Sequence, residues 1–90
     1  MRTIKQLLQV MLDNKDLFNS GLCHWIDQLW FRSKINDDES RLLGKYIREN
    51  KPSKFSSIDA WCSRNNHYYW KPGNITPRIN WINKHIKLNS

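Results

Sequence analysis

The chain has 90 residues, which are too few for two independent hydrophobic cores and exclude a second independently folded domain. Its formal charge is +7, yet Asp59 is the only carboxylate after residue 50, which excludes the carboxylate pairs of hydrolases and two-metal nucleases from that half. The N-terminal MRTIKQLLQVML is interrupted by Lys5, Gln6 and Gln9, so we expect neither a signal peptide nor a membrane span.

Three amphipathic helices are predicted in residues 1–50. The first begins after Thr3, and the second follows Ser20, each residue being suited to cap a helix. The third has the clearest start, because Asn36 with Glu39 three residues later forms a capping-box pattern. It ends at Asn50–Pro52. The residues expected to face the core are Ile4, Leu7, Leu8, Met11 and Leu12, then Leu22, Trp25, Ile26, Leu29 and Trp30, then Leu42, Leu43, Tyr46 and Ile47.

A fourth helix is predicted at the end of the chain, after a stretch without a sustained period over residues 53–66 and an aromatic segment at 68–70. Thr76 fits its N-cap and Pro77 its first helical position. Ile79, Ile82 and Ile86 follow at i, i+3 and i+7, so they are expected to face the core. The predicted fold is mainly α, a small single-domain bundle of about four helices with an irregular aromatic segment before the last helix.

Charge divides the predicted domain, residues 1–90, into two halves. Residues 1–50 are helical and near neutral, with eight Lys or Arg against seven Asp or Glu. Residues 51–90 are basic and aromatic, with seven against one. Such an asymmetry creates an oriented positive field, which attracts phosphates or nucleic acid.

A candidate ligand site lies within this basic half. With the isoleucines turned inward, Arg78, Trp81 and His85 share the neighbouring stripe of the last helix. Arg78 lies in the first helical turn, where free N–H groups already favour an anion, and it could grip a phosphate. Trp81 offers a face for stacking a base, and His85 could contact the edge of that base.

The opposite wall of the candidate site is expected from the segment before the last helix. Lys71 would help Arg78 to hold phosphate, and one aromatic ring would stack against the base. The candidate residues of this wall are Tyr68, Tyr69, Trp70 and Lys71. A structural interpretation stays open beside this one, because the same residues could plug a small core while Arg78 bonds loop carbonyls.

Metal binding and catalysis have little support in the sequence. The sequence has no CxxC or HxxxH pair of the kind that binds zinc, so we expect no zinc. Its possible ligands are Cys23, His24, Cys62, His67 and His85. The two cysteines fit reduced thiols of a cytoplasmic protein without a disulfide. We therefore expect a non-catalytic protein without a metal or cofactor.

Three segments carry a resemblance to a known group of proteins: GLCHWIDQL at Gly21–Leu29, YIRENKP at Tyr46–Pro52 and YYWKPGNITPRINWI at Tyr68–Ile82. Together they resemble a set of small uncharacterised proteins encoded by tailed bacteriophages. The resemblance implies a host-takeover or anti-defence factor in the host cytoplasm, a class that includes inhibitors and sponges for cyclic nucleotide signals. It assigns no binding residue.

The function expected from these observations is non-catalytic binding of a phosphate-bearing nucleotide. The protein would then act as a sponge that sequesters a cyclic nucleotide signal. A second subunit would help so small a domain to enclose its ligand, so a homo-oligomer is part of this expectation. Two alternatives stay open. The basic half could bind nucleic acid through its phosphates, or an aromatic patch could bind and inhibit a host protein.

Overall fold

The computed structural model describes residues 1–19, 25–52 and 75–90. Regular structure within these ranges is helical throughout and consists of α1 (Ile4–Asp13), the 3-10 helix η1 (Lys15–Asn19), α2 (Trp25–Phe31), α3 (Asp37–Asn50) and α5 (Ile75–Leu88). The predicted small helical bundle is confirmed. The aromatic segment expected before the last helix lies outside the described residues.

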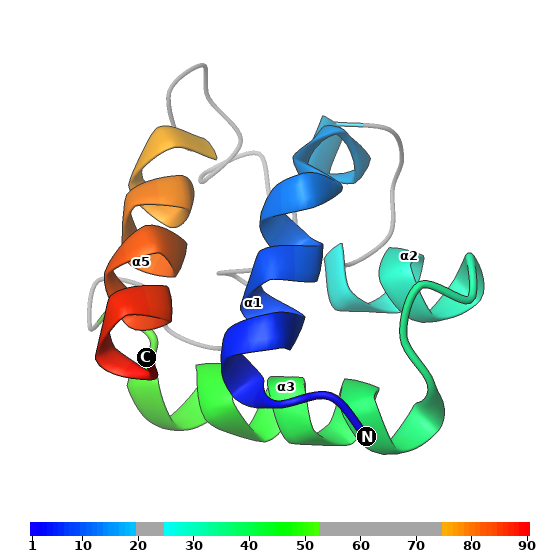
Figure 1. The fold of residues 1–90 in the computed structure, drawn as a ribbon. Coiled ribbons are helices and arrows are strands. Elements are labelled where there is room, and N and C mark those ends of the chain that lie inside the picture. The colour runs from blue at the N-terminus through cyan, green and yellow to red at the C-terminus, as the bar shows by residue number, and fades with distance from the viewer. Residues whose placement is uncertain (20–24, 53–74) are drawn as a thin grey trace.

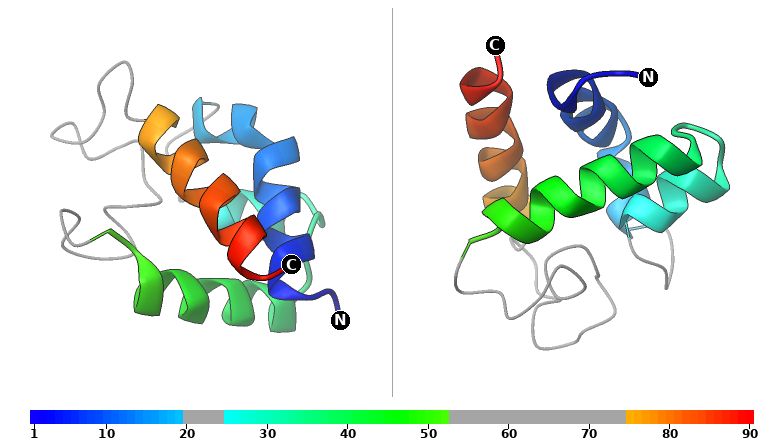
Figure 2. Two further views of the ribbon diagram at one scale, coloured as in Figure 1. Left: turned by 60° about the vertical axis from the view of Figure 1, so that its left-hand side comes forward. Right: turned by 90° about the horizontal axis from the view of Figure 1, so that it is seen from below.

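The arrangement of the helices brings distant parts of the chain together (Figure 1). α1 and α5 lie side by side and run antiparallel, and α3 crosses beneath both of them. α2 packs along α3 at the end opposite to α5, as the views in Figure 2 agree. The bundle therefore has two distinct ends along α3, one at the α2–α3 turn and one where α3 meets α5.

α1 and α3 start at the predicted caps Thr3 and Asn36, and both starts are capping boxes, although the sequence indicated a box only at Asn36. At α1, the Thr3 hydroxyl accepts from the Gln6 N–H at 3.2 Å, and the Gln6 side chain accepts from the Thr3 N–H at 2.9 Å. At α3, Asn36 and Glu39 exchange the equivalent bonds at 2.8 and 3.0 Å. Each box satisfies two N–H groups that a helix start otherwise leaves without partners.

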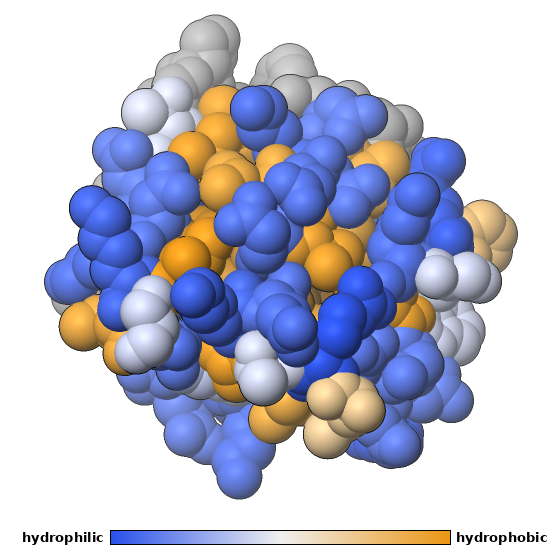
Figure 3. Space-filling view, in the orientation of Figure 1, coloured by the Kyte–Doolittle hydropathy of each residue, from blue (hydrophilic) through white to orange (hydrophobic). Residues whose placement is uncertain are grey.

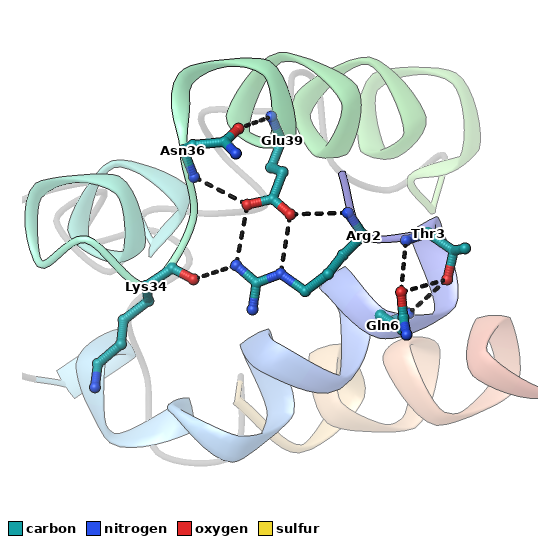
Figure 4. A network of polar contacts seen from close by, with 6 residues as sticks. All are labelled: Arg2, Thr3, Gln6, Lys34, Asn36 and Glu39. Carbon is teal, nitrogen blue, oxygen red and sulfur yellow. Dashed lines mark hydrogen bonds and ion pairs between the residues drawn. The ribbon is translucent and has the colours of Figure 1, made fainter.

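Glu39 also ties the start of the chain to α3, which the sequence did not indicate (Figure 4). Its carboxylate accepts from Arg2 through the backbone N–H at 3.0 Å, Nε at 2.9 Å and Nη2 at 3.0 Å. Arg2 Nη2 also donates to the Lys34 carbonyl. The side-chain hydrogen bond from Arg2 is the main cause that lowers the pKa of Glu39 to about 2. One ion pair thus joins the N-terminus, the α2–α3 turn and α3.

The core lies where the helices meet, and most predicted core positions occupy it. Some of the predicted positions are only partly buried and pack against the edge of the core, namely Ile4, Leu12, Leu42, Tyr46 and Ile86. The buried apolar residues are Leu7, Leu8, Met11, Leu17, Phe18, Trp25, Ile26, Leu29, Ile35, Leu43, Ile47, Trp81 and Ile82. Ser20 and Leu22, the predicted cap and first core residue of the second helix, lie outside the described residues.

Two local predictions were wrong. Trp30 was expected in the core but is 49% exposed. It lies in the last turn of α2, where its indole N–H donates to the exposed Asp37 carboxylate. Thr76 was expected as an N-cap, but α5 begins at Ile75 and includes it. Pro77 is still tolerated there, since the N–H groups of the first helical turn have no partner within the helix.

The molecular surface seen in Figure 3 is mostly hydrophilic, with apolar residues showing between the helices. Among residues 1–19, 25–52 and 75–90, the large apolar side chains that are exposed are Met1, Trp30, Phe31 and Leu88. Among the described helices, none combines the length and the apolar character needed to cross a membrane.

Candidate functional site

The stripe of α5 that carries Arg78, Trp81 and His85 faces the interior of the bundle. Arg78 is 0% exposed, and Trp81 and His85 are each 8% exposed. Ile82 shares this buried face as predicted, whereas Ile79 is only partly buried. The buried face of α5 is therefore rotated from the predicted isoleucine stripe toward the predicted ligand stripe, because α5 packs on α1 and its Trp81 and His85 also contact the end of α3.

Trp81 and His85 form an aromatic cluster with Tyr46 of α3. The Trp81 and His85 rings stack with centroids 4.0 Å apart. Tyr46 approaches both rings edge-on, at 6.2 Å from Trp81 and 5.6 Å from His85. The Trp81 Nε1–H donates to the Asn50 carbonyl at 3.0 Å, so the last turn of α3 is fixed to α5. Stacking and edge contacts of this kind add to the burial of the rings.

A hydrogen-bond chain holds the His85 imidazole in place. The Tyr46 hydroxyl lies 2.7 Å from His85 Nδ1, and Asn89 Nδ2 donates to the Tyr46 oxygen at 2.9 Å. Burial, and secondarily the charge of Lys84, lowers the pKa of His85. The imidazole is therefore neutral near pH 7, and its Nδ1 can accept a hydrogen bond from the Tyr46 hydroxyl. The ring thus acts as a structural hydrogen-bond partner at this junction.

Arg78 packs its guanidinium on an aromatic face. The guanidinium carbon lies 4.9 Å from the centre of the Phe18 ring, within the range of a cation–π contact. Because Arg78 is fully buried, its long side chain also fills volume between α5 and η1. In the described structure, Arg78, Trp81 and His85 therefore each contribute to packing.

The structure brings together three of the seven predicted ligand residues. Arg78, Trp81 and His85 lie on one face, as the helical spacing indicated, and Trp81 contacts His85 directly. Tyr68, Tyr69, Trp70 and Lys71 lie outside the described residues. The use of these seven residues to bind a ligand stays a prediction.

The described residues also offer no assembled metal centre. Within residues 1–19, 25–52 and 75–90, no group of three or more His, Cys, Asp or Glu side chains could hold a metal ion. Cys23, His24, Cys62 and His67 lie outside these ranges.

Exposed positive charge gathers at the end of the bundle where α3 meets α5. The last two turns of α3 carry Lys45 and Arg48, and α5 carries Lys84 and Lys87, all of them exposed. Glu49 is the one acidic residue in the second half of α3, and α5 has none. The opposite end has mixed charge. Asp37, Asp38 and Glu39 form the first turn of α3 and Asp27 lies in α2, while Arg2, Arg32, Lys34 and Arg41 lie near them.

The residues that sequence reasoning missed are those that act across elements. Tyr46 was expected only as a core residue, and no local pattern indicated that its hydroxyl would bond His85. Lys45 and Arg48 belong to the near-neutral half of the sequence, yet contacts from Tyr46 to His85 and Asn89 place their part of α3 beside α5. The helical spacing of Lys45 and Arg48 relative to Tyr46 could have indicated that both are exposed.

Comparison with protein-family models, curated proteins and solved structures finds no match to this chain. The chemistry of its surfaces is therefore the basis for assigning a function.

Proposed function

We propose that the protein is a non-catalytic nucleic-acid-binding protein whose basic end, formed by Lys45, Arg48, Lys84 and Lys87, contacts the phosphate backbone. The supporting observation is the difference in charge between the two ends of α3. At the α5 end, four exposed cations lie with one carboxylate, that of Glu49. At the other end, the carboxylates of α2 and of the first turn of α3 are offset by an equal number of cations, namely Arg2, Arg32, Lys34 and Arg41. Such a field orients the protein toward a polyanion and raises the rate of encounter.

Binding through these residues would be tolerant of sequence. Lysine and arginine contacts to phosphate oxygens supply affinity without reading bases. Three or four such contacts give a modest affinity at physiological salt, in the range of non-specific complexes. A strand or duplex long enough to meet all four side chains should bind better than a mononucleotide, which can meet only one or two of them.

The cyclic nucleotide sponge expected from the sequence is a prediction that stands beside this proposal. Three residues predicted to bind that ligand, Arg78, Trp81 and His85, are at most 8% exposed. A ligand would therefore have to displace the packing around Trp81 and His85 to reach them. The four exposed cations need no such rearrangement. This difference in accessibility favours the basic end.

A matched pair of double variants tests the proposal. Lys84→Gln with Lys87→Gln removes two charges from the basic end, and Arg32→Gln with Lys34→Gln removes two charges from the opposite end. Both double variants have the same net charge. Fluorescence anisotropy with a labelled 20-base-pair duplex should show a loss of about tenfold or more for the first pair, because each phosphate contact contributes to the total.

The control double variant should lose much less affinity, since only the long-range field changes. Equal losses for the two double variants would mean that net charge, and not the basic end, governs binding. Thermal melting of each variant confirms that the exposed substitutions leave the fold intact.

A further inference from the structure

An exposed aromatic ridge stands at the end of the molecule opposite the basic end. Trp30 and Phe31, the last two residues of α2, are 49% and 77% exposed. In the described part of the chain, the other large apolar side chains that are exposed are Met1 and Leu88, so Trp30 and Phe31 form its one adjacent pair of this kind. The Trp30 Nε1–H donates to the Asp37 carboxylate, so the indole is held in one orientation.

Two hollows flank this ridge, and Trp30 and Phe31 contribute to both of them. The larger has a volume of about 860 Å³ and extends from the ridge over the first turn of α3, where Asp37 and Asp38 line it. The smaller has a volume of about 430 Å³ and is lined by Asp27 and Gln28 on the other side. An extended or helical segment could therefore lie across the ridge with side chains in each hollow.

The frame of the larger hollow is rigid. α2 ends in a Schellman motif, in which the Ser33 N–H donates to the Trp30 carbonyl at 3.0 Å and the Lys34 N–H donates to the Leu29 carbonyl at 2.8 Å. Ser33 adopts the left-handed φ of 58° that this motif requires. Arg2 and Glu39, whose ion pair is drawn in Figure 4, also line this hollow, and their opposite charges offset each other. A site with a fixed frame loses little entropy on binding.

Negative charge remains in the hollows once this ion pair is set aside. Asp27, Asp37 and Asp38 line them, and all three are exposed in a protein whose net charge is +7. Arg41 lies 2.7 Å from Asp38 and offsets part of its charge, which leaves Asp37 in the larger hollow and Asp27 in the smaller one. Arg32 and Lys34 are exposed on the turn that follows the ridge, but neither lines these two hollows. A carboxylate in each hollow, next to an exposed indole, suits a cation that can also stack on the ring.

We propose that the ridge of Trp30 and Phe31 is a docking site for a basic, partly apolar segment of another protein. Apolar side chains of that segment would cover Phe31, a lysine or arginine would lie on the Trp30 face, and Asp27 and Asp37 would pair with flanking cations. This site is separate from the basic end, so a partner and a nucleic acid could bind at the same time. The protein would then connect a basic protein to a phosphate backbone.

The test uses two synthetic peptides of equal length, one built from Lys and Leu in helical spacing and the other with every Lys replaced by Glu. Isothermal titration with the full chain should show binding of the lysine peptide only. Chemical shift changes in a ¹⁵N-labelled sample should be confined to α2, the α2–α3 turn and the first turn of α3.

Two variants should each lower the affinity for the lysine peptide at least fivefold. One is Trp30→Ala, and the other combines Asp27→Asn with Asp37→Asn. Leu88→Ala is the matched control for an exposed apolar side chain, and Asp13→Asn is the control for an exposed carboxylate. Both controls should bind like the wild type. Phe31→Ser, at the most exposed position of the ridge, provides a second ridge variant if Trp30→Ala melts early.

Three outcomes would overturn the proposal. The glutamate peptide could bind as well as the lysine peptide, which would remove the charge argument. The ridge variants could bind the lysine peptide like the wild type, which would place binding elsewhere. Sedimentation could show a wild-type dimer that Trp30→Ala converts to a monomer, in which case the occupant of the ridge is a second copy of this chain.

Discussion

Replacing Glu39 with Gln exchanges one carboxylate oxygen for an NH₂ group, and we expect this small change to destabilise the fold strongly. The Glu39 carboxylate accepts four hydrogen bonds, with Arg2 Nη2 and the Asn36 N–H on one oxygen and Arg2 Nε and the Arg2 N–H on the other. A Gln side chain must place its NH₂ group against one of these donor pairs. Two hydrogen bonds are lost, and the ion pair disappears with them.

The size of this effect follows from the exposure of the two partners. Each hydrogen bond to a charged acceptor contributes about 1.5 to 3 kcal/mol. The Arg2 side chain is 40% exposed, whereas that of Glu39 is 5% exposed. Water can therefore replace part of the hydrogen bonding that the Arg2 guanidinium loses in the variant. We therefore expect a loss of about 2 kcal/mol in the free energy of unfolding, or about 8 to 16 °C in Tm for a domain of this size.

Thermal unfolding followed by circular dichroism at pH 7 measures this loss, with Glu49→Gln on the exposed face of the same helix as the control.

The pH dependence provides a second test. The pKa of Glu39 is lowered from 4.5 to about 2, so its contribution is fully present above pH 4.5 and is lost as the pH falls toward 2. The difference between wild type and Glu39→Gln should shrink across that window. A Glu39→Gln protein that melts with the Glu49→Gln control at pH 7 would refute this reasoning.

Further predictions concern the α3–α5 junction and the helix caps. Urea unfolding of the wild type should show stability falling as the pH drops below 6.5, because the pKa of His85 is lowered in the folded state, which keeps it neutral; His85→Gln should reduce this dependence. Trp81→Phe keeps a ring but removes the indole hydrogen bond and should cost about 1 kcal/mol in urea unfolding. Arg78→Ala removes a fully buried side chain packed on Phe18 and should lower stability by about 2 kcal/mol or more by the same assay, whereas an unchanged midpoint would show that Arg78 is dispensable for the fold. Asn36→Ala should cost about 1 kcal/mol through loss of the α3 cap, measured as a shift in Tm.

Sequence patterns predicted the helices well where the signal is local. Capping boxes depend on residues three positions apart, so Thr3 and Asn36 could be recognised directly. The buried apolar positions of α1 and α3 follow from helical spacing alone, whereas the burial of Glu39 does not. The orientation of α5 could not be obtained in this way, because Arg78, Trp81 and His85 are polar or mixed in character and only their neighbours on other elements make their burial favourable.

The surfaces were less predictable than the helices. Trp30 resembles a core residue by composition and spacing, and its exposure depends on where α2 ends relative to α3. The ion pair of Arg2 with Glu39 joins residues 37 positions apart, and no local pattern indicates it. The basic end likewise combines Lys45 and Arg48 with Lys84 and Lys87 from separate halves of the sequence. Functional surfaces assembled in this way depend on tertiary packing.

The most direct test of the proposed function is a salt titration of nucleic-acid binding by the wild-type protein. Contact with three or four phosphates predicts that affinity for a 20-base-pair duplex falls by about 100-fold between 50 and 200 mM salt. A cyclic dinucleotide titrated at the lower salt concentration should bind weakly or not at all. Tight binding of the cyclic dinucleotide that persists at high salt, together with no binding of the duplex at low salt, would contradict the account and favour a sponge.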